Sequence, residues 1–183
     1  MKPIHLRNVP PPLETFDHVS YFSFICSYLK PERYLELGVR DGRNFNPISE
    51  FCQESWGVDT SSCPFNLKGN MKYFQMTTDK FFEELDPNIK FDMIFIDADH
   101  SHEQSLKDFM NASKHIIEDG FIFFHDTYPY DPYMFDPGFC NDAYKTPLFI
   151  KKNLIDDFEI LTLPFNPGVT MVKKISRFKQ LIY

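Results

Sequence analysis

Two short apolar runs separated by a helix-like stretch constrain the fold of this chain more than any other feature. Residues 91–96 (FDMIFI) and 121–124 (FIFF) are apolar enough to be buried on both faces, which is typical of central strands in a parallel sheet. Between them, Ser101 can begin a long helix, and Gly120 can provide its left-handed C-terminal stop. The apolar stripe of this helix consists of Leu106, Phe109, Met110 and Ile117. Strand, helix and strand in this order predict a β-α-β unit.

The same alternation continues in both directions along the chain. Upstream, the pattern predicts strands at residues 33–37, 55–59 and 72–76. It predicts helices from Thr15 or Asp17 to Leu29, from about residue 46 to 53, and from Thr78 or Asp79 to Leu85. Downstream, residues 158–163 and 169–173 flank Asn166-Pro167-Gly168, a turn sequence that predicts an antiparallel hairpin. The expected fold is an α/β three-layer sandwich with a doubly wound, mostly parallel seven-stranded sheet and a C-terminal antiparallel hairpin.

The length of 183 residues is usual for one domain. Pro10-Pro11-Pro12 predicts an extended arm at residues 1–14, so residues 15–183 are expected to form the domain. The sequence shows no signal peptide and no membrane span, and the four cysteines form no CxxC pair, which together favour a cytoplasmic protein with free thiols. A net charge of -7 argues against general nucleic-acid binding and suits an enzyme that acts on a small molecule.

Glycines and carboxylates follow the first two predicted strands. In the segment ELGVRDG, Gly38 and Gly42 allow backbone amides to approach a ligand closely. Glu36 at the strand tip is poorly placed for a pyrophosphate and well placed for an ammonium group. Asp59 ends the next strand, where a carboxylate can hydrogen-bond a ribose diol, although it can also cap the turn that follows.

Thr78 and Asp79 follow the third predicted strand. Either residue can cap the next helix, and both can contact an adenine amino group. Like the residues above, they lie at the carboxyl end of a strand, where ligands bind in a doubly wound sheet. We therefore expect all of these residues to face one crevice.

The richest group of candidate catalytic residues follows the next two strands. Asp97 and His125 end strands that should be neighbours, so they should converge on one cleft together with His100 and Asp126. Carboxylates and imidazoles so arranged can hold a divalent cation, or can act as a general base and its orienting groups. His100 could instead be a structural residue that ties its loop to the backbone.

Five segments, in this order, resemble the class I S-adenosylmethionine-dependent methyltransferases: ELGVRDG, WGVD, FDMIFIDADHSHE, IIEDGFIFFHD and FNPGVTMVKK. The likeness spans roughly residues 33–174. It is closest to the small O-methyltransferase-like branch that includes macrocin and other sugar methyltransferases and the cephalosporin-hydroxylase relatives. The resemblance implies a Rossmann-like methyltransferase fold, S-adenosylmethionine as cofactor, and a small-molecule methyl acceptor.

The resemblance also implies roles for individual residues. Those implied to bind the cofactor are Glu36, Gly38, Val39, Gly42, Asp59, Thr78, Asp79 and Asp97. Those implied to hold a divalent cation, magnesium or manganese, are Asp97, His125 and Asp126. The sequence departs from the family pattern at His125, which replaces an acid, and at Arg40, which stands where many relatives carry glycine. Imidazole is a poor magnesium ligand and favours softer metals such as manganese, iron or zinc.

The expected reaction is direct displacement, in which an acceptor oxygen attacks the sulfonium methyl group. Asp97 or His100 is the expected base, and His125 completes the expected catalytic set. The loop at residues 128–141, rich in aromatic and acidic side chains, is expected to cover a sugar-like or polyhydroxylated acceptor.

Three alternatives remain open from the sequence. A nicotinamide-dependent oxidoreductase would share the sheet, but its Gly-x-Gly-x-x-Gly turn does not occur in this chain. A metal phosphohydrolase would explain the His125-Asp126 pair. In helical phosphohydrolases, however, that pair lies on helices, whereas here it follows the predicted strand FIFF. A non-catalytic relative that binds the cofactor or a nucleoside would keep the pocket without turnover.

Overall fold

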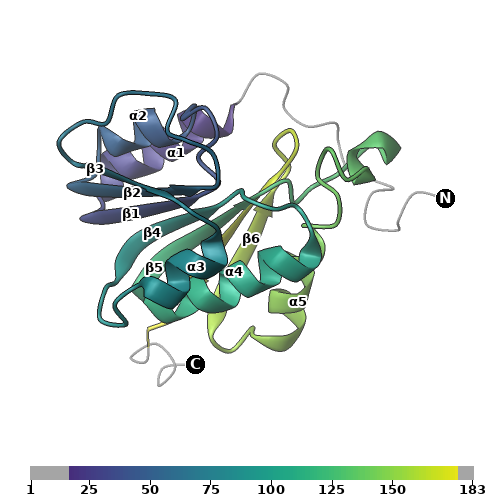
Figure 1. The fold of residues 1–183 in the computed structure, drawn as a ribbon. Coiled ribbons are helices and arrows are strands. Elements are labelled where there is room, and N and C mark those ends of the chain that lie inside the picture. Colours follow the sequence, from purple (N-terminus) through teal and green to yellow (C-terminus); the bar gives the residue numbers. More distant parts are fainter. Residues whose placement is uncertain (1–16, 177–183) are drawn as a thin grey trace.

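The computed structural model describes residues 17–176 as a seven-stranded sheet between two helical layers (Figure 1). The strands are β1 (Arg33–Leu37), β2 (Glu54–Asp59), β3 (Met71–Gln75), β4 (Phe91–Ile96), β5 (Ile116–His125), β6 (Phe158–Leu163) and β7 (Val169–Lys174). The helices are α1 (His18–Leu29), α2 (Phe45–Ser49), α3 (Thr78–Glu84), α4 (His102–His115) and α5 (Lys145–Asn153), with a 3-10 helix at Pro132–Phe135. The arm expected at residues 1–14, and Thr15, lie outside the described residues.

The strand order is β3-β2-β1-β4-β5-β7-β6. Strands β1 to β5 pair in parallel, whereas β7 runs antiparallel to both β5 and β6. The turn between β6 and β7 places Gly168 at a φ of 109°, which glycine adopts easily. The expected doubly wound fold with its antiparallel hairpin is confirmed. Because the strand order reverses between β1 and β4, a crevice is expected at the carboxyl ends of these two strands.

Alternating side chains along the central strands build one core on each face of the sheet. Leu35 points toward the layer of α3, α4 and α5, where it packs in one cluster with Phe109 of α4. Tyr34 points toward the layer of α1 and α2, where it shares a cluster with Phe22 and Phe45. Figure 1 shows these two layers on opposite sides of the sheet. The sheet is therefore covered on both faces, as continuous apolar strands require.

Polar side chains fix the helix starts. Asp17 accepts a hydrogen bond from the Val19 amide at 3.0 Å and begins α1, as one of the two expected caps. Ser101 begins α4 as expected. The prediction that Thr78 or Asp79 caps α3 is wrong, because Thr77 accepts from the Lys80 amide at 3.2 Å. Thr78 and Asp79 instead line the pocket at the carboxyl ends of the strands.

The predicted end of α4 is also wrong. The helix stops at His115, and Gly120 lies inside β5 without a positive φ. A β-carbon on Gly120 would lie 3.0 Å from the Asp92 carbonyl oxygen, so glycine is needed for close approach to β4. Ile117, expected in the buried stripe, is 37% exposed in this irregular part of the strand pairing. Met110, also expected there, is 43% exposed.

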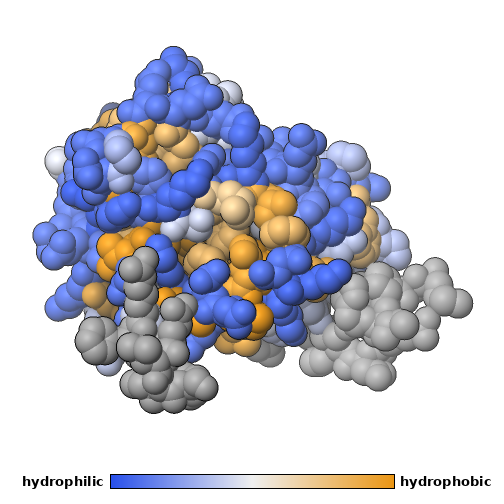
Figure 2. Space-filling view, turned by 90° about the horizontal axis from the view of Figure 1, so that it is seen from below, coloured by the Kyte–Doolittle hydropathy of each residue, from blue (hydrophilic) through white to orange (hydrophobic). Residues whose placement is uncertain are grey.

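Two further differences concern α2 and α5. Helix α2 ends at Ser49, four residues before the expected end, whereas α5 was not expected. Pro147 lies in the first turn of α5, where its missing amide is tolerated. Figure 2 views the molecule from below, on the side of α3, α4 and α5, and shows apolar residues among hydrophilic ones on this face. Exposed apolar side chains of α4 and α5 include Met110 and Leu148.

Candidate active site

A pocket of about 910 Å³ opens at the carboxyl ends of the central strands, where the strand order reverses. This volume is in the range of small-molecule sites, about 300–1,000 Å³. Eight of the predicted site residues line it: Gly38, Asp59, Thr78, Asp79, Asp97, His100, His125 and Asp126. These residues end or follow β1 to β5, so the sheet brings together residues from five separate segments of the chain.

The close approach of two strand ends forms the floor of the pocket. The Gly38 amide donates to the Val58 carbonyl at 2.8 Å, and the Asp97 amide donates to the Leu37 carbonyl at 2.9 Å. Gly38 has a φ of 87°, and a β-carbon there would overlap the backbone of Asp97. Glycine at this position therefore keeps the floor open and lets the loop after β1 lie against the end of β4.

Two backbone amides hold the Asp59 carboxylate at the pocket wall. Its Oδ2 accepts from the Arg40 amide and its Oδ1 accepts from the Ser61 amide, each at 2.8 Å. The turn-capping role is therefore present, but a carboxylate has lone pairs left to accept hydrogen bonds from a ligand. The contact with the Arg40 amide also fixes the loop after β1 against the end of β2.

Side chains from α3 and α4 meet at the far end of the pocket. The Gln104 amide nitrogen lies 3.1 Å from the Thr78 hydroxyl, 3.1 Å from the Asp79 carboxylate and 3.0 Å from the Asp108 carboxylate. Lys107 forms a further ion pair with Asp79. Gln104 lines the pocket and thus holds the two predicted adenine contacts in place.

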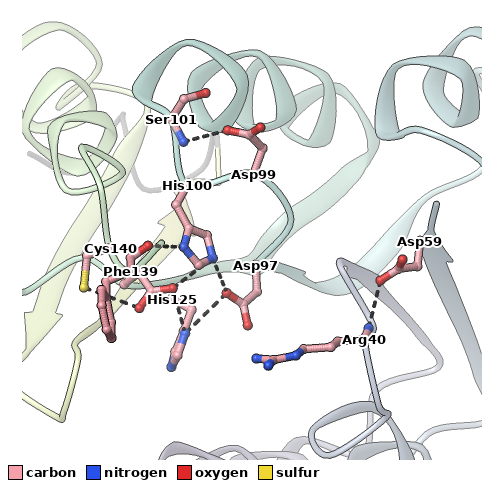
Figure 3. A network of polar contacts seen from close by, with 10 residues as sticks. Arg40, Asp59, Asp97, Asp99, His100, Ser101, His125, Phe139 and Cys140 are labelled. Atoms are coloured by element: carbon pink, nitrogen blue, oxygen red, sulfur yellow. Dashed lines mark hydrogen bonds and ion pairs between the residues drawn. The ribbon is translucent and has the colours of Figure 1, made fainter. Parts of the chain in front are cut away.

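Two carboxylates and two imidazoles face one another at the other end of the pocket (Figure 3). The Asp97 carboxylate lies 3.4 Å from His100 Nε2 and 3.3 Å from His125 Nδ1. The Asp126 carboxylate lies 3.0 Å from the same His100 nitrogen and 3.3 Å from the same His125 nitrogen. The predicted convergence of these four residues is therefore observed.

Charge within this cluster shifts the ionisation of its members. The contact with Asp97 raises the pKa of His100 to about 9, despite burial. Burial lowers the pKa of His125, but the charge of Asp97 and the contact with Asp126 outweigh it and raise that pKa to about 10. Burial raises the pKa of Asp97, but His125 and His100 outweigh burial and lower it. At neutral pH the cluster thus holds imidazolium groups against carboxylates.

The donor atoms of three members fit a divalent cation. Asp97, His100 and Asp126 can each offer one ligand atom, and these atoms lie within 4.8 Å of one another. The combination differs from the predicted set, in which His125 was the nitrogen ligand. One imidazole nitrogen and two carboxylate oxygens suit manganese, iron or zinc better than magnesium.

The loop over the cluster contacts it through one main-chain oxygen and one thiol side chain. His100 Nδ1 contacts the carbonyl oxygen of Phe139, and the Cys140 thiol lies 3.5 Å from the Asp126 carboxylate. Gly138 and Phe139 line the pocket. The structural role expected for His100 is therefore present, because one ring nitrogen ties the loop, while the other ring nitrogen faces the carboxylates.

Three residues predicted as cofactor contacts lie behind the pocket wall instead. The Glu36 carboxylate is 1% exposed and accepts hydrogen bonds from the Tyr34 hydroxyl at 2.5 Å and the Asn44 amide at 3.0 Å. Burial raises the pKa of Glu36 to about 8. Val39 is part of the core on the α1 side, and Gly42, at a φ of 78°, packs against Phe65.

His18 is a neighbour of the cluster that was missed in the sequence. Its ring centroid lies 4.4 Å from that of His125, and burial together with the His125 charge lowers the pKa of His18 to about 4. In the described part of the chain, His125 Nε2 has no hydrogen-bond partner. Since 107 positions separate the two histidines, no local sequence pattern could have paired them.

The sequence profile of a family described as "Methyltransferase domain" matches residues 35–127, slightly more than half of the chain. The chain belongs to this family. The matched segment of the methyltransferase domain runs from β1 to the residues after β5, and so contains the pocket floor, Asp59 and the histidine–carboxylate cluster. The expected class I methyltransferase is confirmed in family and in fold.

Solved structures share the fold of the methyltransferase domain. The S-adenosylhomocysteine-bound methyltransferase PaMTH1 of Podospora anserina is similar with a TM-score of 0.70 and 16% identity, over 87% of this chain and 78% of that one. The Bacillus cereus O-methyltransferase in complex with S-adenosylhomocysteine has a TM-score of 0.69 and 14% identity, over 89% and 84%. The O-methyltransferase TomG of Streptomyces achromogenes in complex with S-adenosylmethionine has a TM-score of 0.65 and 12% identity, over 90% of this chain and 83% of that one.

No match was found among curated protein sequences. Among the helices of residues 17–176, none combines the length and the apolarity that crossing a membrane requires.

Proposed function

We propose that the methyltransferase domain binds S-adenosylmethionine in its pocket and transfers the methyl group to an oxygen of a small polyhydroxylated acceptor. The observation that carries this proposal is the shared pocket of Asp59, Asp79 and Asp97, three carboxylates supplied by the ends of separate β-α steps. Such a wall suits a ligand with a ribose diol, an adenine amino group and a sulfonium charge. The structures that contain S-adenosylmethionine or S-adenosylhomocysteine in the same fold support this choice of cofactor.

Each part of the cofactor has a place along this wall in the proposal. Asp59 accepts hydrogen bonds from the ribose, and Thr78 and Asp79 border the adenine. Gly38 provides the close backbone approach for the methionine half, while Glu36, Val39 and Gly42 shape the loop from behind. Asp97 lies beside the methyl group to be transferred.

The proposed chemistry is in-line displacement. The acceptor oxygen forms a bond to the methyl carbon while the carbon–sulfur bond breaks, and the hydroxyl proton passes to the Asp97 carboxylate. Raised pKa values keep His100 and His125 protonated, so these two imidazoles hold the carboxylate in place rather than accept the proton. Correct alignment in such a site can lower the barrier by about 7–11 kcal/mol.

Asp97, His100 and Asp126 would hold a divalent cation in this proposal. A bound cation would polarise the acceptor hydroxyl and favour its ionisation. The proton that His100 shares with the carboxylates would leave when the metal binds, because a ligating imidazole is neutral.

The acceptor class follows from the loop that covers the cluster. The rings of Tyr133 and Phe139 pack edge to face with centroids 5.4 Å apart, and 48% and 52% of these residues are exposed. Aromatic faces beside carboxylates suit the apolar and hydroxyl-bearing sides of a sugar-like molecule. A sugar-like acceptor agrees with the branch that the sequence resembles.

The test is calorimetric titration with S-adenosylhomocysteine, together with thermal unfolding in its presence. Ligand at about 100 times its dissociation constant should add about 2.7 kcal/mol of stability to the parent protein. Asp59→Ala should lose most of this gain. Asp86→Ala is the matched control, because Asp86 also accepts from the amide two residues ahead but lies outside the pocket. An equal response of Asp59→Ala and the parent would contradict the ribose assignment.

A second measurement separates catalysis from binding alone. Methyl transfer to a panel of polyhydroxylated acceptors should be detectable for the parent and lost in Asp97→Asn, while the Asp97→Asn protein still binds S-adenosylhomocysteine. A parent that binds this ligand but transfers methyl groups to none of the panel would favour the non-catalytic alternative.

A further inference from the structure

Arg40 occupies an unusual position in the pocket wall. It is an exposed, non-glycine residue with a φ of 51°, between two glycines that also have positive φ values. Its backbone amide is bound to Asp59 at 2.8 Å. The backbone at this position therefore favours glycine, yet the chain carries a long cationic side chain there.

The guanidinium of Arg40 is available to a ligand. Its side chain extends from the loop in the direction of Asp97, and both residues line the pocket (Figure 3). Of the three arginines in residues 17–176, Arg33 and Arg43 form ion pairs with carboxylates, whereas Arg40 forms none. Its fork of N–H donors is thus free to bind an anion in bidentate geometry.

The rest of the pocket wall is strongly acidic. Five aspartates line it, and Arg40 is the one lysine or arginine that does so within the described chain. His100 and His125 are engaged with Asp97 and Asp126. An anionic group that enters this pocket therefore has one permanently charged partner, and that partner is Arg40.

We propose that Arg40 binds the carboxylate of the methionine half of the cofactor, an assignment that rests on the proposed function. This half carries an ammonium and a carboxylate at neutral pH. The acidic wall suits the ammonium and the sulfonium but repels the carboxylate, so a guanidinium beside the loop after β1 compensates for that repulsion. Arg40 thus selects the complete amino-acid tail rather than the nucleoside alone.

The experiment compares two ligands that differ in this carboxylate. Calorimetry measures the affinity of S-adenosylhomocysteine and of its decarboxylated analogue, S-adenosyl-3-thiopropylamine, which keeps the ammonium. The proteins are the parent, Arg40→Gly and Arg40→Met. Glycine tolerates the positive φ and should leave the unfolding midpoint unchanged or raise it, while methionine keeps an aliphatic side chain without the charge.

Both variants should bind S-adenosylhomocysteine about tenfold to hundredfold more weakly than the parent, as expected for a lost charge-assisted contact. Their affinity for the decarboxylated analogue should stay within about twofold of the parent value. Equal weakening of both ligands, or of neither, would overturn the assignment. A raised KM for an acidic acceptor with unchanged cofactor affinity would also overturn it, because the carboxylate would then belong to the acceptor. If the parent binds neither ligand, the proposed function itself fails.

Discussion

Gly38 and Asp97 are so close that a β-carbon on Gly38 would lie 2.1 Å from the Asp97 carbonyl oxygen. The two residues follow β1 and β4, the strands between which the sheet order reverses. Because the overlap is with backbone, no side-chain rotation can relieve it. The floor of the pocket therefore requires a residue without a β-carbon at position 38.

Gly38→Ala should destabilise the protein by about 2–5 kcal/mol, from the strained positive φ and the backbone overlap together. Chemical unfolding measures this loss. Gly69→Ala is the control, because nothing lies within 4 Å of its added β-carbon. Its stability should stay equal to that of the parent or rise by up to about 1 kcal/mol. Equal stability of the two variants would show that the strand ends can separate freely.

The buried Glu36 predicts a dependence of stability on pH. Its folded-state pKa of about 8 lies above the usual value of 4.5. Between these two pH values the folded protein retains a proton on Glu36 that the unfolded chain releases. The contribution of Glu36 to the free energy of unfolding is therefore fully present below pH 4.5 and is lost as the pH rises to about 8. The free energy of unfolding should fall across this window.

Glu36→Gln isolates this effect, since glutamine keeps the shape and can still accept from Tyr34 and Asn44. The difference in unfolding free energy between variant and parent should grow in favour of the variant from pH 5 to pH 8, by up to a few kcal/mol. Parallel pH profiles for the two proteins would mean that Glu36 ionises normally.

Gln104 should stabilise the adenine end of the pocket. Gln104→Ala removes the donor shared by Thr78, Asp79 and the fully buried Asp108, so stability should drop by about 1–3 kcal/mol and affinity for S-adenosylhomocysteine should fall. Gln75→Ala is the control, because its amide makes one long contact of 3.4 Å at the exposed end of β3. Matching behaviour of the two variants would contradict the role of Gln104.

The metal ligand set is tested by titration with manganese. His100→Ala should abolish calorimetric binding, because His100 supplies the nitrogen of the candidate ligand group with Asp97 and Asp126. His125→Ala should keep measurable binding. The opposite ranking would restore the ligand set expected from the sequence, and absence of binding to the parent at millimolar manganese would remove the metal from the proposal.

The elements of the fold that depend only on burial of apolar side chains could be predicted from the sequence. Residues 91–96 were predicted as a strand with the observed bounds, because an apolar run buried on both faces leaves no other interpretation. The positions of Asp59, Asp97 and Asp126 followed from the rule that parallel strands present their carboxyl ends at one edge of the sheet.

The remaining features depend on contacts between distant segments. Gly120 resembles a helix stop, but the strand pairing shifts between Phe91 and Met93, and only the neighbouring strand reveals why glycine is required. Helix α5 is stabilised by burial of Thr146 and Ile150, although Pro147 between them makes the sequence look like a loop. Sequence spacing also gives no means to choose between His100 and His125 as the nitrogen ligand of a cation, because a ring nitrogen of each lies within 3.4 Å of Asp97.

The contact between His100 and the Phe139 carbonyl links the covering loop to the reactive cluster. An outward displacement of Phe139 would remove this contact and leave the imidazole held only by Asp97 and Asp126. An oversized acceptor would therefore disturb the same group that it needs for reaction. In the proposed reaction the loop would thus select acceptors by size through the orientation of a single ring, without a wall that blocks entry.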